Sequence, residues 1–300
     1  MKDFEITQNN YEKYILKNLY THSKNIKKIL KLQKDLFNIQ IKKIPRTQNI
    51  YFNLVKEVLI GYDENSSRIL EDLVRLIKGK KYFSSMFLLR GLIEYYLYSI
   101  YITFKIFYHL KTNNFEGIIK IICRASISAG KESIATETFF SNDLYCRLFN
   151  KFKNNRIHIN DCLEFNKKQN WVDLFSKDYS RVQGLQKFDI KKHFKLTKGS
   201  KFILKKFERF LEYNKSNLNF SGLDYIYFKL CEIIHPTAII LHKHNNKISI
   251  VDFKNLITGL YSTDILPISV LALDFKALIF DWLITYRNEF VSKFKDSINK

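Results

Sequence analysis

The sequence has little of what β-rich or disulfide-stapled folds need. Only nine glycines and three prolines occur in 300 residues, too few for the turns of a sandwich or propeller. The four cysteines lie far apart without C-x-x-C spacing, which predicts reduced, buried thiols in a cytosolic protein. The N-terminus lacks an apolar stretch after a basic start, so we expect no cleaved secretory signal. These scarcities favour long helices in a cytoplasmic protein.

What is present supports an all-α bundle. A hydrophobic content of 46% fills a core and excludes global disorder. We predict one helical domain over 1–300, built around a central helix at 82–110 that is apolar around nearly its whole circumference. The region 111–219 is more polar and reads as a basic insertion or subdomain. A short β-hairpin is predicted at 238–251, around Asn245-Asn246.

Several boundaries follow from local signals. Pro45 is expected to end a first amphipathic helix that carries a basic face, and Gly61 to end a second helix. The cluster Asp63–Ser66 is expected to cap a third helix. The apolar stretches 82–110 and 265–286 contain charged residues that are costly in a bilayer, so both are predicted as core helices and no membrane partner is expected.

The charge balance points to a polyanion. Fifty Lys and Arg stand against 29 Asp and Glu, a formal +21, and 40 of the basic residues are lysines. Many of these lysines are spread over the faces of the predicted helices. Two stretches concentrate them, Lys17–Lys43 and Lys187–Lys215.

The second stretch interleaves lysines with phenylalanines. Lysines give salt-sensitive affinity for phosphates, and exposed aromatic rings stack on unpaired bases. The alternative is a solvated basic face whose phenylalanines belong to the core. The candidate nucleic-acid-binding residues are Lys191, Lys192, Lys195, Lys198, Lys201, Lys205, Lys206 and Arg209.

Arg90 and Glu94 form the most informative pair. They lie four residues apart on one face of the central helix, among apolar neighbours. One interpretation is a structural salt bridge; the other is a polar pocket with a further partner, because buried charges must be paired. His235, before Pro236 at a predicted helix break, is the candidate third member and could be catalytic or structural.

These residues carry a resemblance. The helix Leu88-Leu89-Arg90-Gly91-Leu92-Ile93-Glu94, followed much later by Cys231-Glu232-Ile233-Ile234-His235-Pro236, resembles an uncharacterised bacterial all-helical family with L-x-R-x-x-x-E and S-x-x-x-H-P helices. That family is similar to the HEPN group of toxin–antitoxin and phage-defence proteins, many of which are metal-independent ribonucleases. The resemblance implies an all-helical fold and a defence role.

The usual HEPN nuclease motif, R-x(4–6)-H, is absent, since none of the ten arginines has a histidine five to seven residues later. A ribonuclease or hydrolase would therefore need another arrangement, with Arg90, Glu94 and His235 as its catalytic candidates. His242 and His244 form an H-x-H pair, a weak candidate for two metal ligands. No cofactor is expected. Asp274 and Asp281 share a face of the last apolar helix and are predicted to pair with Arg or Lys inside the bundle.

The leading hypothesis is a HEPN-like effector of a bacterial defence or toxin-type system that engages RNA or DNA through its basic surface. A non-enzymatic scaffold or adaptor that binds an acidic protein partner, such as one from the same operon, is the alternative. A homo-oligomer is compatible with both.

Overall fold

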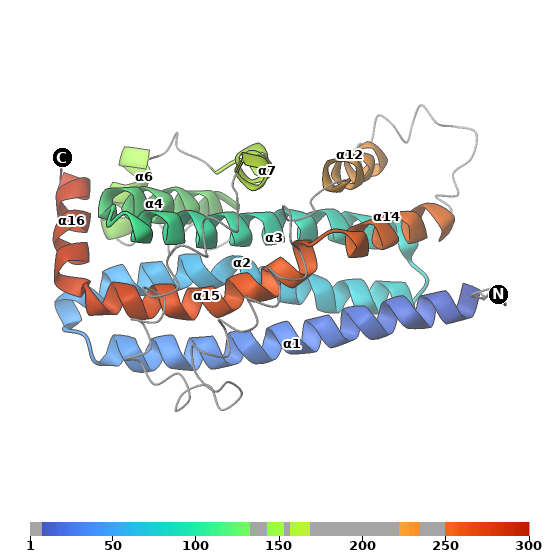
Figure 1. The fold of residues 1–300 in the computed structure, drawn as a ribbon, viewed down its shortest axis with the longest axis horizontal. Helices are drawn as coiled ribbons and strands as arrows, with labels where there is room; N and C mark the ends of the chain where they lie inside the picture. The colour runs from blue at the N-terminus through green and yellow to red at the C-terminus, as the bar shows by residue number, and fades with distance from the viewer. Residues whose placement is uncertain (1–7, 133–142, 153–156, 169–221, 235–249, 300) are drawn as a thin grey trace.

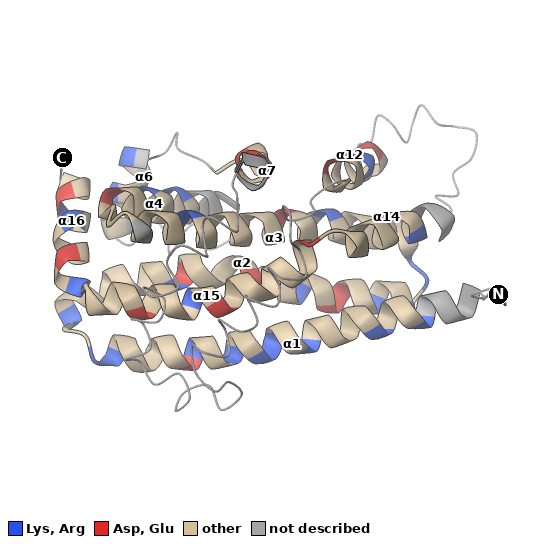
Figure 2. Ribbon diagram, viewed as in Figure 1, with Lys and Arg blue, Asp and Glu red and all other residues tan. Residues whose placement is uncertain are grey.

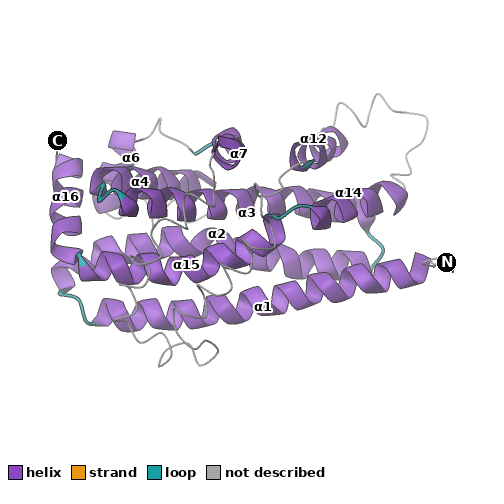
Figure 3. Ribbon diagram, in the orientation of Figure 1, coloured by secondary structure: helices purple, strands orange, loops and turns teal. Residues whose placement is uncertain are grey.

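All elements in the described part of the chain are helices (Figures 1 and 3). The computed structural model describes residues 8–132, 143–152, 157–168, 222–234 and 250–299. The predicted all-α class is confirmed. The predicted hairpin lies outside these residues except for its last two, 250 and 251, which begin helix α14 (Ile250–Ser262) instead.

Two long antiparallel helices form one side of the bundle. Helix α1 (Gln8–Lys42) ends just before Pro45, as predicted, and α2 (Arg46–Lys78) follows at once. The predicted end at Gly61 is wrong, because α2 continues through it. A helical glycine costs only about 1 kcal/mol relative to alanine, and the buried residues on both sides of Gly61 outweigh that cost.

Helix α3 (Tyr82–Lys111) is the central helix that the sequence predicted. It packs against α2 on one side, α15 (Ile265–Thr285) on another and α4 (Phe115–Glu132) on a third (Figure 1). Nearly every residue of α15 is buried, so both predicted core helices are confirmed. None of the described helices has both the length and the apolar character that crossing a bilayer requires.

Aromatic rings fill the interior between these helices. Phe37 of α1 stacks on Phe280 of α15 with ring centroids 4.1 Å apart. The last helix, α16 (Arg287–Asn299), lies across one end of the bundle (Figure 1). Its Phe290 packs against Phe52 of α2 and Phe115 of α4, which closes that end of the core.

Three described helices come from the 111–219 region: α4, α6 (Asp143–Phe152) and α7 (Ile159–Lys168). The side chain of Asn114 caps α4 by accepting a hydrogen bond from the backbone N–H of Gly117 at 2.8 Å. Cys123 and Cys162 are buried free thiols. Burial raises the pKa of Cys123 to about 12, which keeps it protonated.

Candidate functional site

The outer face of α1 carries a row of exposed lysines. Its apolar side chains, among them Ile15, Leu19 and Ile26, are buried against α2 and α15. Lys17, Lys24 and Lys31 are exposed and follow one another at seven-residue intervals. Seven residues are almost two helical turns, so these lysines share one face, opposite the buried one.

The charge on this helix is mostly positive. Helix α1 contains eight lysines and two acidic residues, Glu12 and Asp35. Two glutamates of α2 neutralise part of the positive charge: Glu71 pairs with Lys27 at 2.8 Å, and Glu64 pairs with Lys34 at 2.6 Å. Both pairs lie on the side of α1 that borders α2.

Several lysines on the outer face have no acidic partner among the described residues, and four of them lie together between residues 17 and 31. We call these four the α1 lysine row: Lys17, Lys24, Lys28 and Lys31. Blue basic positions follow α1 along the lower edge of the molecule in Figure 2. Within the row, Lys24 and Lys28 are four residues apart and Lys28 and Lys31 three apart, so like charges repel along the helix. The row therefore costs helix stability and provides a line of cations in water.

Arg90 and Glu94 meet a third residue, Tyr227, where α12 (Leu223–Ile234) crosses α3. The guanidinium Nε of Arg90 donates to Glu94 Oε1 at 3.1 Å, and the Tyr227 hydroxyl donates to the same oxygen at 2.7 Å. Arg90 also donates to the Tyr227 hydroxyl at 3.4 Å. One carboxylate oxygen thus joins two helices that are more than a hundred residues apart in the sequence.

The burial predicted for this pair is wrong. The side chains of Arg90 and Glu94 are 30% and 28% exposed. Burial and the hydrogen bond to Glu94 raise the pKa of Tyr227 above its usual range, so the hydroxyl keeps its proton. Burial by itself would lower the pKa of Arg90, but Tyr227 and Glu94 outweigh it and the net pKa is raised. The network is a neutral tyrosine bound to an ion pair, an arrangement that holds α12 in place.

Close packing fixes α12 on its other side. Leu223, Ile226 and Leu230 are buried, and Ile226 lies against Gly259 of α14. A methyl group on Gly259 would come within 3.0 Å of the Ile226 side chain. The opposite face of α12 leaves Tyr225 and Phe228 exposed.

Several sequence-predicted site residues fall outside the described part of the chain. They are His235, both histidines of the H-x-H pair (His242 and His244) and the basic candidates Lys191, Lys192, Lys195, Lys198, Lys201, Lys205, Lys206 and Arg209. The described part of α12 extends to Ile234, so the predicted helix break at His235 lies outside the described residues. In the described ranges, no three His, Cys, Asp or Glu side chains gather as a metal would require.

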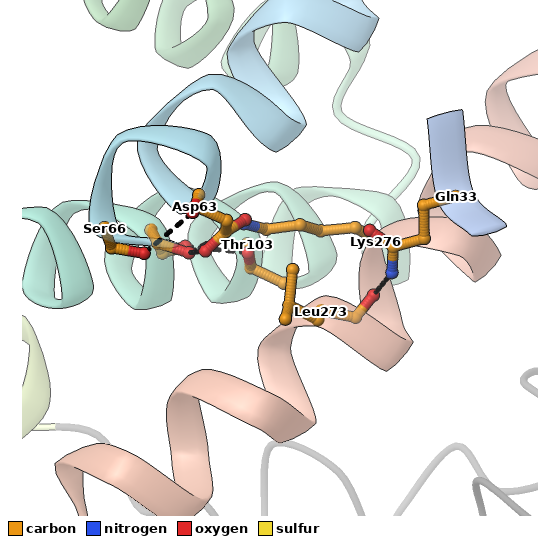
Figure 4. Close-up of polar contacts among 7 residues, drawn as sticks. Gln33, Asp63, Ser66, Thr103, Leu273 and Lys276 are labelled. Atoms are coloured by element: carbon orange, nitrogen blue, oxygen red, sulfur yellow. Dashed lines mark hydrogen bonds and ion pairs between the residues drawn. The ribbon is translucent and has the colours of Figure 1, made fainter. Parts of the chain in front are cut away.

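Sequence reasoning missed a buried polar cluster in the centre of the bundle (Figure 4). Asp63, predicted as a helix-capping residue, lies inside α2 and accepts a hydrogen bond from Lys276 of α15. Ser99 of α3 donates to Asp63 at 2.6 Å and accepts from Lys276 at 2.6 Å. Burial raises the pKa of Asp63 and lowers that of Lys276, and the attraction between the two opposes both shifts.

Two further polar contacts, one partly buried and one buried, involve α1. His22 hydrogen-bonds the hydroxyl of Tyr96 at 3.0 Å, and burial lowers the His22 pKa to about 4. Gln40 donates to Asp281 at 3.1 Å, which corrects the prediction of an Arg or Lys partner for this carboxyl. Asp274 is buried as well. These groups lie in the core, so they specify how the helices pack.

No family model, curated protein or solved structure matches this chain.

Proposed function

We propose that this protein binds nucleic acid through the outer face of α1, as a HEPN-like helical effector of a bacterial defence or toxin-type system acting in the cytoplasm. The observation that carries the proposal is the α1 lysine row, four exposed lysines without acidic partners in the described residues. The basic stretch Lys187–Lys215, outside the described residues, is proposed to extend the same affinity.

A row of cations of this kind suits a polyanion. Phosphates occur at regular intervals along a nucleic-acid backbone, and each lysine that neutralises one releases a condensed counterion. The four lysines extend from residue 17 to residue 31 of α1, which gives a contact line of about 21 Å along the helix. Lysines, as mobile point charges, give affinity that does not depend on base sequence.

The α1 lysine row also lowers the stability of the helix, and the packing of the bundle does not explain why the lysines are there. Neighbouring lysines three and four residues apart destabilise an isolated helix by roughly 0.2–0.5 kcal/mol per pair. Their side chains are exposed. Exposed positions that cost stability are expected where a ligand is bound.

The test replaces the row with uncharged residues. Lys17, Lys24, Lys28 and Lys31 are changed together to glutamine, which preserves helix propensity. The matched control changes four exposed lysines on other helices, Lys78, Lys120, Lys293 and Lys295, and so removes the same charge. Affinity for a labelled RNA or DNA oligomer is measured by filter binding at low salt.

We expect the row variant to lose most of its affinity and the control variant to lose little. Equal losses would mean that net charge alone attracts the oligomer and would contradict a site on α1. If the unmodified protein binds neither RNA nor DNA but forms a nuclease-resistant complex with an acidic protein, the scaffold alternative replaces the proposal.

A further inference from the structure

Two tyrosines flank the α1 lysine row near its N-terminal end. Tyr14 and Tyr20 are 63% and 58% exposed, the most exposed large hydrophobic side chains among those described on α1. Each lies three residues from Lys17, one before it and one after it. At 100° per residue, the two rings stand about 60° to either side of Lys17 around the helix.

This placement differs from that of a ring in the core. The buried residues Ile15 and Leu19 of the same two turns are 3% and 0% exposed, so the apolar face of α1 is already used. Tyr14 and Tyr20 therefore add aromatic surface to the cationic side of the helix. A polymer that follows Lys17, Lys24 and Lys31 passes between the two rings.

We propose that the ligand is single-stranded nucleic acid, whose unpaired bases stack on Tyr14 and Tyr20 while the α1 lysine row neutralises its phosphates. The inference rests on the proposed function and specifies its ligand. Bases in a duplex are stacked on one another and face inward, whereas bases of a single strand offer their planes to exposed rings.

Other occupants fit this face less well. Two copies of the chain joined through α1 would set one lysine row against another, and like charges repel. A lipid surface requires an apolar helix face that inserts below the headgroups, and that of α1 is buried in the bundle. An acidic protein matches the charge but does not carry a flat base beside each of its charges, as a single strand does.

The experiment compares three probes with the full chain. They are a labelled oligothymidylate of about 15 nucleotides, within the usual range of single-strand site sizes, an abasic oligomer of equal length, and a duplex of equal length. The abasic oligomer keeps every phosphate and removes every base. Fluorescence anisotropy gives the affinity for each probe.

The variants test the contribution of the tyrosine rings to binding separately from that of the lysine charges. Tyr14→Ala with Tyr20→Ala removes both rings, and Tyr14→Phe with Tyr20→Phe keeps them. Alanine at exposed helix positions does not threaten folding. Tyr225→Ala is the matched control, because Tyr225 is 65% exposed, lies near a lysine and belongs to another helix.

We expect the double alanine variant to bind oligothymidylate at least about tenfold more weakly, given the usual strength of one base–ring stack. The phenylalanine variant and Tyr225→Ala should bind as the wild type does, and affinity for the abasic oligomer should not change. Wild-type protein should prefer oligothymidylate to both other probes.

The following results would overturn the inference. If the wild type binds the abasic oligomer or the duplex as tightly as oligothymidylate, or the alanine variant loses nothing, the rings do not stack. The proposed function then stands on the lysines alone, provided the lysine variant still loses affinity. If no probe binds, the proposed function fails and the inference fails with it.

Discussion

Asp63 and Lys276 form an ion pair in the centre of the bundle, between α2 and α15. Their side chains are 2% and 0% exposed, so water does not screen the pair. Ser99 of α3 hydrogen-bonds both partners, which ties three helices together at one point. Such a buried cluster stabilises one packing of the helices over others only while all its members are satisfied.

Removing either partner should destabilise the protein strongly. Asp63→Asn or Lys276→Met leaves the remaining charge buried without its counter-ion, a loss of about 3–5 kcal/mol in comparable cases. The double variant should lose less than the sum of the single losses, because it buries no unpaired charge. Denaturant unfolding of the four proteins measures these values. Strictly additive losses would show that the two residues do not interact.

His22 should make the fold sensitive to acid. Burial lowers its pKa from 6.5 to about 4, so the unfolded chain takes up a proton that the folded chain refuses. The contribution of His22 to stability is therefore complete above pH 6.5 and is lost as the pH falls toward 4, a change of roughly 2–3 kcal/mol. Relative to wild type, His22→Gln should lose less stability between pH 7 and pH 4.5. Parallel stability curves for the two proteins would contradict this.

Asp281 should lower the stability of the fold as the pH rises, over nearly the same pH range in which His22 raises it. Burial raises its pKa from 3.8 to about 7, and the hydrogen bond from Gln40 opposes that shift. The unfolded chain ionises first as the pH rises, so Asp281 lowers stability progressively from pH 4 to pH 7. Asp281→Asn removes this penalty and should stabilise the protein by about 2–4 kcal/mol at pH 8, and hardly at all at pH 4. Destabilisation at pH 8 would show that the carboxylate is needed in its charged form.

Tyr227 should hold α12 without taking part in nucleic-acid binding. Tyr227→Phe removes the 2.7 Å hydrogen bond to Glu94, worth about 1 kcal/mol at a partly exposed site. Amide hydrogen exchange in α12 should speed up by roughly fivefold, with affinity for nucleic acid unchanged. Tyr225→Phe on the exposed face of α12 is the control.

Substitutions in the network of Arg90, Glu94 and Tyr227 also test the alternative that the protein is an enzyme. If the protein cleaves RNA, and both Glu94→Gln and His235→Ala abolish cleavage with the melting temperature nearly unchanged, then Arg90, Glu94 and His235 belong to a reaction site. A loss of stability in Glu94→Gln would instead support the structural interpretation.

The helical class and the central helix could be predicted because glycine and proline are scarce and apolar residues recur with helical period. The end predicted at Gly61 failed because local propensity is weaker than tertiary packing. Asp63 was misassigned for the same reason: a polar cluster in sequence looks like a cap, and its buried partner Lys276 is 213 residues away.

The candidate site was only partly predictable. The spacing of Arg90 and Glu94 correctly indicated a pair on one face of α3, but sequence does not give the exposure of a helix face or the nearness of Tyr227. The basic face of α1 was visible as a charge pattern. Which of its lysines pair with Glu64 and Glu71 depends on how α2 lies beside α1, and so required the structure.

The most direct test of nucleic-acid binding through α1 is the salt dependence of affinity. For single strands, the logarithm of the binding constant falls with the logarithm of salt concentration, with a slope of about −0.7 per neutralised phosphate. Glutamine at Lys17, Lys24, Lys28 and Lys31 should make this slope shallower by about 3 units, and the control with Lys78, Lys120, Lys293 and Lys295 replaced should keep the wild-type slope. An unchanged slope in the α1 variant would contradict the proposal.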